Sequence, residues 1–292
     1  MDIVNEIKAS FKQGSYLTQL IYVNLAVFVF VNLLTVFFFL AGESIYSSPI
    51  ISYLAVPADI YELLWKPWTV ITYMFLHEAF LHILFNMLWL YWFGKIFLQY
   101  LDQKQLLSVY LMGGFAGAFL FIVSYNIFPV LQSHHAVALG ASASVMAVVF
   151  AISFYVPNYQ LPLMFIGNVR LKYIAIFSII IDVISIPTSN SGGHIAHIGG
   201  AVFGWYFITE YKKGKLITKG FDTFLEKVFT FFQKNSKPKM SYKKTGNTDY
   251  DYKNKKATEQ NKMNVILEKI SKSGYSSLTK EEKELLFKMG QK

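Results

Sequence analysis

Long uncharged stretches separate short polar segments over the first two thirds of the chain. Residues 13–42 and residues 105–169 contain no charged side chain. A helix of about 20 apolar residues crosses a hydrocarbon core about 30 Å thick. The first stretch therefore has room for one membrane span. The second has room for two, separated by a turn around Pro129 and ended at Pro157.

Three further apolar segments complete the pattern: residues 79–94, residues 173–186, and the stretch from residue 194 to Tyr206. The sequence therefore predicts an all-α, polytopic membrane protein with six spans. We expect the first span to be retained, because no small-residue cleavage site follows its apolar core. The long segment 41–69 carries two tryptophans, and we expect it to lie in the membrane interface.

Charge is distributed unevenly and predicts the orientation of the spans. Residues 211–292 hold 20 of the 27 Lys and Arg residues and have a net charge of +11, whereas residues 1–210 have a net charge of −2. Six of the seven earlier basic residues fall in segments on one side of the predicted spans: Lys8, Lys12, Lys95, Lys104, Arg170 and Lys172. By the positive-inside rule both termini face the cytoplasm. This distribution excludes a uniformly basic nucleic-acid binder.

The charge pattern also divides the chain into five parts. Residues 1–14 form a cytoplasmic N-terminus, and residues 15–210 form the six-span core. Residues 211–234 have phenylalanines at helical spacing with lysines between them, which predicts an amphipathic helix on the bilayer surface. Residues 235–260 are a polar, flexible linker. Residues 261–292 predict a cytoplasmic module of two short helices, the second with a capping box. The sequence does not indicate which partner this module binds.

All six histidines lie between residues 77 and 197, at the outer ends of spans or in outer loops of the predicted topology. They are His77, His82, His134, His135, His194 and His197. Ionisable groups are costly inside a membrane, so this clustering indicates a function. We expect His77 to form hydrogen bonds in its loop, and His134 and His135 to be solvated.

A candidate nucleophile lies at the same depth. Ser142 opens the fourth span among small residues, where the unpaired N–H groups of a helix start can stabilise an oxyanion. His197, near the outer end of the sixth span, can accept the serine proton. His82 and Asn86 lie four residues apart on one face of the second span, and both can donate hydrogen bonds. The absence of cysteine excludes disulfides and thiolate sites.

Three short motifs make the chain resemble the rhomboid family of intramembrane serine proteases. They are H-x-x-x-N at residues 82–86, G-x-S at residues 140–142 and A-H-x-G-G at residues 196–200. Each motif alone is weak, but the three occur in this order on spans two, four and six. The resemblance covers roughly residues 15–210. The end of the chain also resembles a short C-terminal module of some bacterial rhomboids.

The resemblance implies a six-span helical bundle that cleaves peptide bonds in or beside transmembrane segments without a cofactor. It implies that Ser142 is the nucleophile and His197 the general base, with no acidic third member. His82, Asn86 and the Ser142 backbone N–H would form the oxyanion hole. The supporting positions are Gly140, Ala143, Met146, His194, Gly199 and Gly200. The implied partners are substrate proteins and the bilayer, and the expected location is a bacterial plasma membrane with the site open to the outside.

Two positions depart from the family pattern, and three others have open roles. The family commonly has Gly where this chain has Ala143, whose methyl we expect to crowd the oxyanion hole. It often has an aromatic residue where this chain has Met146, which can support the histidine ring only by packing. Ser144 competes as nucleophile, but it lies about 200° round the helix from Ser142. His194 either positions His197 or hydrogen-bonds the loop. Asp182 is either a gate residue or a helix-packing residue.

Two other classes of function stay open beside the protease. A catalytically silent, rhomboid-like protein that binds membrane proteins would have the same fold. A histidine-ligated metal enzyme needs three or four converging ligands, whereas this chain offers the pair His194 and His197 plus loop histidines, so we expect no metal. A transporter would show internal repeats, which the sequence lacks on inspection.

Overall fold

The computed structural model of the chain describes residues 3–42, 49–132, 136–163, 167–188, 190–232, 266, 269–270 and 274–290. These residues belong to two compact units, Met1–Phe232 and Gln233–Lys292. The predicted linker 235–260, His134 and His135 lie outside the described residues.

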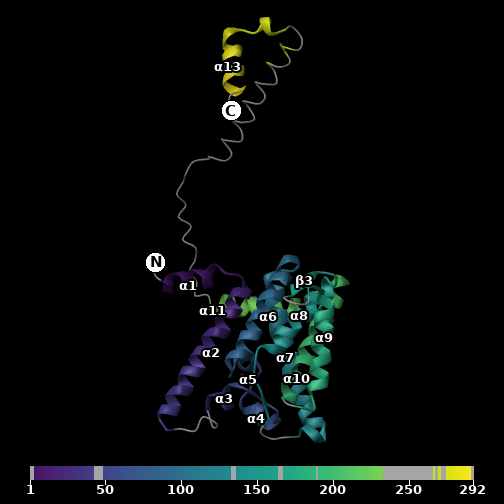
Figure 1. Cartoon of the computed structure of the whole chain (residues 1–292). Coiled ribbons are helices and arrows are strands. Elements are labelled where there is room, and N and C mark those ends of the chain that lie inside the picture. Colours follow the sequence, from purple (N-terminus) through teal and green to yellow (C-terminus); the bar gives the residue numbers. More distant parts are fainter. Residues whose placement is uncertain are drawn as a thin grey trace. The chain divides into compact units, whose positions relative to one another are not determined.

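The first unit is a bundle of long helices with shorter helices at its ends (Figure 1). The long helices are α2 (Tyr16–Leu40), α6 (Phe80–Tyr100), α7 (Gln103–Ile127), α8 (Ser142–Tyr155), α9 (Leu171–Ser185) and α10 (Ser191–Lys212). The shorter helices are α1 (Ile3–Gln13), α3 (Pro49–Leu54), α4 (Ile60–Trp65), α5 (Thr69–Thr72) and α11 (Lys219–Phe232). Figure 1 shows α1 and α11 at one end of the long helices, and α3 and α4 at the other end.

The six long helices coincide with the six predicted spans. Of the described helices, α2, α6 and α7 are long and apolar enough to cross a membrane, and α8 is a shorter apolar helix. The prediction of an all-α membrane bundle is therefore confirmed, while the count of six spans stays a prediction. Helix α8 contacts α6, α7, α9 and α10, and its residues 143–153 are all buried. A helix that is apolar on every side is expected in such a central position.

Small residues bring α8, α10 and α7 unusually close together. A Cβ atom built on Gly200 of α10 would lie 2.0 Å from the carbonyl oxygen of Ala143, and one on Gly204 would lie 2.1 Å from that of Ala147. On the other side, a Cβ on Gly113 of α7 would lie 2.1 Å from the Cβ of Ala147. Without side chains at these glycines the backbones touch, as in small-xxx-small packing in membranes. These contacts fix the N-terminal half of α8 against α10.

Two short antiparallel strand pairs flank the bundle. Strand β1 (Val56–Pro57) pairs with β2 (Val137–Ala138), and β3 (Gln160–Leu163) pairs with β4 (Gly167–Arg170) between α8 and α9. Strand β2 lies just before α8. The first pair therefore ties the loop before Ser142 to the long segment between α2 and α6.

The predicted amphipathic helix appears as α11, which packs against α7 through several side chains. The Phe221 ring meets the Phe115 ring edge-on at 6.1 Å, and Asp222 accepts a hydrogen bond from the Ser108 hydroxyl. Phe224 and Phe231 keep 57% and 83% of their surface exposed, as expected for side chains that face lipid. The helix is thus docked on the bundle as well as amphipathic.

The second unit contains a 3-10 helix (Tyr275–Ser277) and α13 (Lys280–Gly290). The predicted capping box is confirmed at the start of α13. The backbone N–H of Glu282 donates to Thr279 Oγ1 at 3.3 Å, and the backbone N–H of Thr279 donates to Glu282 Oε2 at 2.8 Å. The Nζ atom of Lys269 donates to the same carboxylate at 2.9 Å. Most of the first predicted helix of this module lies outside the described residues.

Candidate active site

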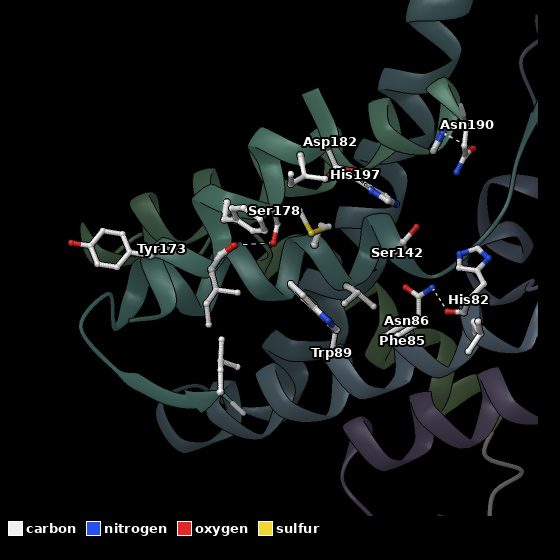
Figure 2. Close-up of a pocket in the computed structure, with 18 of the residues that line it drawn as sticks. His82, Phe85, Asn86, Trp89, Ser142, Tyr173, Ser178, Asp182, Asn190 and His197 are labelled. Carbon is white, nitrogen blue, oxygen red and sulfur yellow. Dashed lines mark hydrogen bonds and ion pairs between the residues drawn. The ribbon is translucent and has the colours of Figure 1, made fainter. Parts of the chain in front are cut away.

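A cavity of about 990 Å³ opens among α6, α8, α9 and α10. Its wall is mostly apolar, but polar side chains from all four helices line it, and Figure 2 shows them around one space. They include His82, Asn86, Ser142, Asp182, Asn190 and His197. The structure therefore brings the predicted nucleophile, base and oxyanion donors together from three separate spans.

The loop before α8 places Ser142 at the first position of the helix. Gly140 has a φ of 123°, a conformation that favours glycine. A Cβ there would lie 2.9 Å from the ring of His82 and 3.5 Å from the hydroxyl of Ser142. The glycine thus leaves room for the His82 ring beside the loop that leads to Ser142. The backbone N–H of Gly140 donates to the carbonyl of Tyr73 at 2.9 Å, which fixes the turn.

His77 accepts a hydrogen bond from the loop that precedes α8. The backbone N–H of Ala141 donates to Nε2 of His77 at 3.4 Å, so the proton of this buried ring lies on Nδ1. That nitrogen is 3.4 Å from the carbonyl of Phe75, which can accept its proton. The expected hydrogen-bonding role of His77 in the loop is confirmed, and its ring also packs edge-on against His82 at 5.0 Å.

His82 and Asn86 project from one face of α6 into the cavity (Figure 2). The amide nitrogen of Asn86 donates one hydrogen to the backbone carbonyl of His82 at 2.9 Å. This bond orients the amide and leaves its second hydrogen for another acceptor. The first turn of α8 adds unpaired backbone N–H groups and the positive end of a helix dipole. A negative oxygen in this space would meet donors from two helices.

His197 has an acidic partner that the resemblance did not imply. Oδ1 of Asp182 on α9 lies 2.8 Å from Nδ1 of His197 and 2.8 Å from Nδ1 of His194. The structure thus places a carboxylate beside His197, where the resemblance implied no acidic group. The physical reason is that α9 packs against α10 with this carboxylate turned toward the N-terminal half of α10. Asp182 is 6% exposed, and its two hydrogen bonds to the histidines are partly buried.

Among the described residues, Asp182, His194 and His197 also form a group whose nitrogen and oxygen atoms lie within 4.8 Å of one another. Each histidine nitrogen is 2.8 Å from the same oxygen, which is the length of a direct charge-assisted hydrogen bond. A tetrahedral metal bound at about 2.1 Å to both atoms would hold them about 3.4 Å apart. We therefore assign the group as hydrogen-bonded.

Two family profiles match the sequence of the chain. A family profile described as "Rhomboid domain" matches residues 64–212, which is half of the chain. This chain belongs to the rhomboid family. A second profile, "Family of unknown function (DUF6576)", matches residues 247–292.

Several curated rhomboid-like proteins are similar to about half of this rhomboid. Presenilin-associated rhomboid-like protein A, mitochondrial, of Danio rerio is 30% identical over 45% of this chain and 34% of its own length. The Homo sapiens presenilin-associated rhomboid-like protein, mitochondrial, is 30% identical over 46% and 35%. RHOMBOID-like protein 12, mitochondrial, of Arabidopsis thaliana is 29% identical over 50% and 47%. The matched region thus spans a third to a half of each relative.

The two departures from the rhomboid pattern lie in different environments. The Cβ of Ala143 faces α7, where it would lie 2.5 Å from a Cβ built on Gly117, and Ala143 does not line the cavity. The expectation that its methyl crowds the oxyanion hole is therefore not supported. The side chain of Met146 lines the cavity together with His197. Its supporting role stays a prediction.

The competing serine faces away from the reactive groups. Ser144 is 1% exposed, and its hydroxyl would lie 2.6 Å from a Cβ built on Gly114 of α7. It has no hydrogen-bond partner among the described residues and does not line the cavity. Of these two serines, Ser142 is thus the one that lines the cavity. Gly199 and Gly200 carry out the predicted packing role, because Cβ atoms there would strike the backbones of α7 and α8.

Proposed function

We propose that this rhomboid is an intramembrane serine protease. It hydrolyses peptide bonds in or beside transmembrane segments of membrane-protein substrates, with Ser142 as nucleophile and His197 as general base. The observation that carries the proposal is the convergence of Ser142, His197, His82 and Asn86 on one cavity. Membership of the family supports it further.

The reaction follows from the protons that these side chains can hold. The Ser142 oxygen attacks the carbonyl carbon while its proton moves to Nε2 of His197. The carbonyl oxygen becomes an oxyanion, which His82, Asn86 and the start of α8 stabilise by hydrogen bonds. When the C–N bond breaks, His197 returns the proton to the leaving amine. Water then attacks the ester, gives a proton to the same nitrogen, and releases the acid as the Ser142 hydroxyl is restored.

The cavity wall favours an apolar substrate segment. Phe85 and Trp89 of α6 face the space from one side, and Tyr173 and Phe177 of α9 line it from another. A substrate helix has its carbonyls bonded internally, so the segment must unwind before Ser142 can attack. Small or helix-breaking residues near the scissile bond lower the cost of unwinding. We therefore expect such residues next to the cleavage site.

The location of the protein is part of the same proposal. This is a membrane protein, with three described helices apolar and long enough to span a bilayer. The relatives are named as mitochondrial proteins. For this chain we propose a bacterial plasma membrane. Both termini would lie in the cytoplasm, because basic residues gather in the segments that would lie inside. The active site then opens on the outer side.

The test compares two serines that lie two residues apart. Purified wild type, Ser142→Ala and Ser144→Ala are each reconstituted in liposomes with a model single-span substrate, and the products are identified by mass spectrometry. We expect wild type and Ser144→Ala to cleave at the same bond, and Ser142→Ala to be inactive. A fluorophosphonate probe should label Ser142 in the first two proteins only. Cleavage that persists in Ser142→Ala contradicts Ser142 as the nucleophile. A wild type that neither cleaves nor takes the probe contradicts the proposal and favours a silent binder.

A further inference from the structure

We infer that Asp182 is a positioning residue that completes a Ser-His-Asp arrangement, with His194 holding the carboxylate in place. This inference rests on the proposed function, because it assigns a role in the same reaction. It differs from a dyad of Ser142 and His197 acting without an acidic group. The evidence is the geometry of three side chains on α9 and α10.

The hydrogen bonds determine which nitrogen of His197 is free. An ionised carboxylate only accepts hydrogen bonds, so the proton on each histidine that faces Asp182 must lie on Nδ1. Nε2 of His197 then carries a lone pair. This is the nitrogen that must accept the Ser142 proton. Asp182 therefore selects the tautomer that is ready to act as a base.

The charge of Asp182 matters most when the reaction is under way. Once His197 has taken the serine proton its ring is a cation, and the cavity around it is largely apolar. A buried cation is costly unless an anion lies next to it. The Asp182 carboxylate, 2.8 Å from Nδ1, supplies that anion without moving. The interaction is stronger in the transition state than before it, which is the requirement for acceleration.

His194 limits the rotation of the carboxylate. It lies one helical turn before His197 on α10 and donates to the same Oδ1 atom. The two imidazole rings stand nearly perpendicular, at 85° with 5.9 Å between their centroids. Two donors from one rigid helix therefore fix a single acceptor oxygen. The sequence leaves two roles open for His194, positioning His197 or hydrogen-bonding the loop. The hydrogen bond from His194 to Asp182 favours the positioning role.

A purely structural role is the alternative, in which Asp182 only ties α9 to α10. The two roles respond differently to Asp182→Asn. The amide keeps the size of the side chain and one oxygen that can accept both N–H groups, so it preserves a tether. It removes the negative charge that stabilises the His197 cation. A tether should survive this substitution, whereas a catalytic environment that needs the charge should not.

The experiment measures kcat, KM and thermal midpoint for full-length Asp182→Asn in liposomes with the model substrate. We expect kcat to fall about 100-fold or more, with KM within about threefold of wild type and a thermal midpoint within a few degrees. Asp182→Glu should recover part of the lost kcat, because it restores the charge. His194→Asn should lower kcat by about tenfold, since the carboxylate keeps one of its two donors.

The matched control is Asp222→Asn. Asp222 is also a carboxylate that joins two helices, and it accepts hydrogen bonds from the hydroxyls of Ser108 and Thr218. It lies on α11, away from the cavity. We expect this variant to retain the wild-type kcat. The control therefore shows what the loss of a helix-joining carboxylate does by itself.

The outcomes separate the inference from the proposed function. If Asp182→Asn keeps kcat within about threefold of wild type, the inference is overturned and the protease proposal stands. If its activity falls only through a higher KM and a lower thermal midpoint, Asp182 is a tether and the inference is again overturned. If Ser142→Ala cleaves as well as wild type, the proposed function itself fails, whatever Asp182→Asn does.

Discussion

Replacing Gly200 with alanine tests whether the close contact of α8 and α10 sets the reactive geometry. Gly200 lies one helical turn after His197, and its neighbour across the interface is Ala143, which directly follows Ser142. The interface is therefore adjacent to both reactive side chains. Any separation of the two backbones here moves the base away from the nucleophile.

The size of the movement follows from the contact distances. A Cβ on Gly200 would lie 2.0 Å from the Ala143 carbonyl oxygen and 2.8 Å from its carbonyl carbon, whereas real Cβ atoms essentially never come closer than 3.0 Å. The backbones must therefore separate by at least about 1 Å at this point. A misplacement of about 1 Å can lower a rate about 100-fold. Overpacking costs about 1–3 kcal/mol of stability, and the better helix propensity of alanine returns up to about 1 kcal/mol.

The assay compares kcat and thermal midpoint for wild type, Gly200→Ala and Gly220→Ala in the same liposomes. Gly220 lies in α11, and a Cβ there would meet nothing within 4 Å. We expect Gly220→Ala to retain full activity and equal or higher stability. Gly200→Ala should stay folded but lose about 100-fold in kcat. A Gly200→Ala variant as active as wild type would refute the reasoning that this contact sets the distance between Ser142 and His197.

Two further predictions concern other parts of the chain. Tyr73→Phe removes a buried hydroxyl that donates to the carbonyl of Gly114 at 2.5 Å, so the free energy of unfolding should fall by about 1 kcal/mol. The kcat should stay at the wild-type value, because the Gly140 turn is bound by the backbone carbonyl of residue 73, which the substitution keeps. An unchanged thermal midpoint would contradict the predicted loss of stability. At the start of α13, the side chain of Lys269 and then the backbone N–H of Thr279 hold the pKa of Glu282 below its usual value of 4.5. The ion pair of Lys269 and Glu282 therefore stabilises α13 at pH values above 4.5, and this stabilisation is lost as the pH falls through the lowered pKa of Glu282. Amide-exchange protection of α13 in the full chain should drop on acidification, and Glu282→Gln should abolish the drop.

The sequence predicted those parts of the site that depend on position along one helix. His82 and Asn86 share a face because they are four residues apart, and Ser144 points away from Ser142 because it is two residues on. Both predictions agree with the cavity, which exposes Ser142 and excludes Ser144. The direction of the Ala143 methyl could not be predicted, because it depends on which helix covers that face of α8. In the structure this is α7, where Gly117 leaves room for the methyl.

For Asp182, the sequence predicts the depth of the side chain in the helical bundle but not the direction in which it points. Helix α9 ends at Ser185 and α10 begins at Ser191, so the turn between them is centred on residue 188. Asp182 and His194 are each six residues from that centre, and a helical hairpin places such residues at the same depth. The spacing therefore predicts that Asp182 and His194 lie at the same depth, with His197 one helical turn farther along α10. It does not predict that they face each other, because the rotation of α9 about its axis is set by packing against α8 and α10. Only the structure supplies that rotation, and the rotation turns a lone carboxylate in an apolar segment into the hydrogen-bond partner of His197, the proposed base.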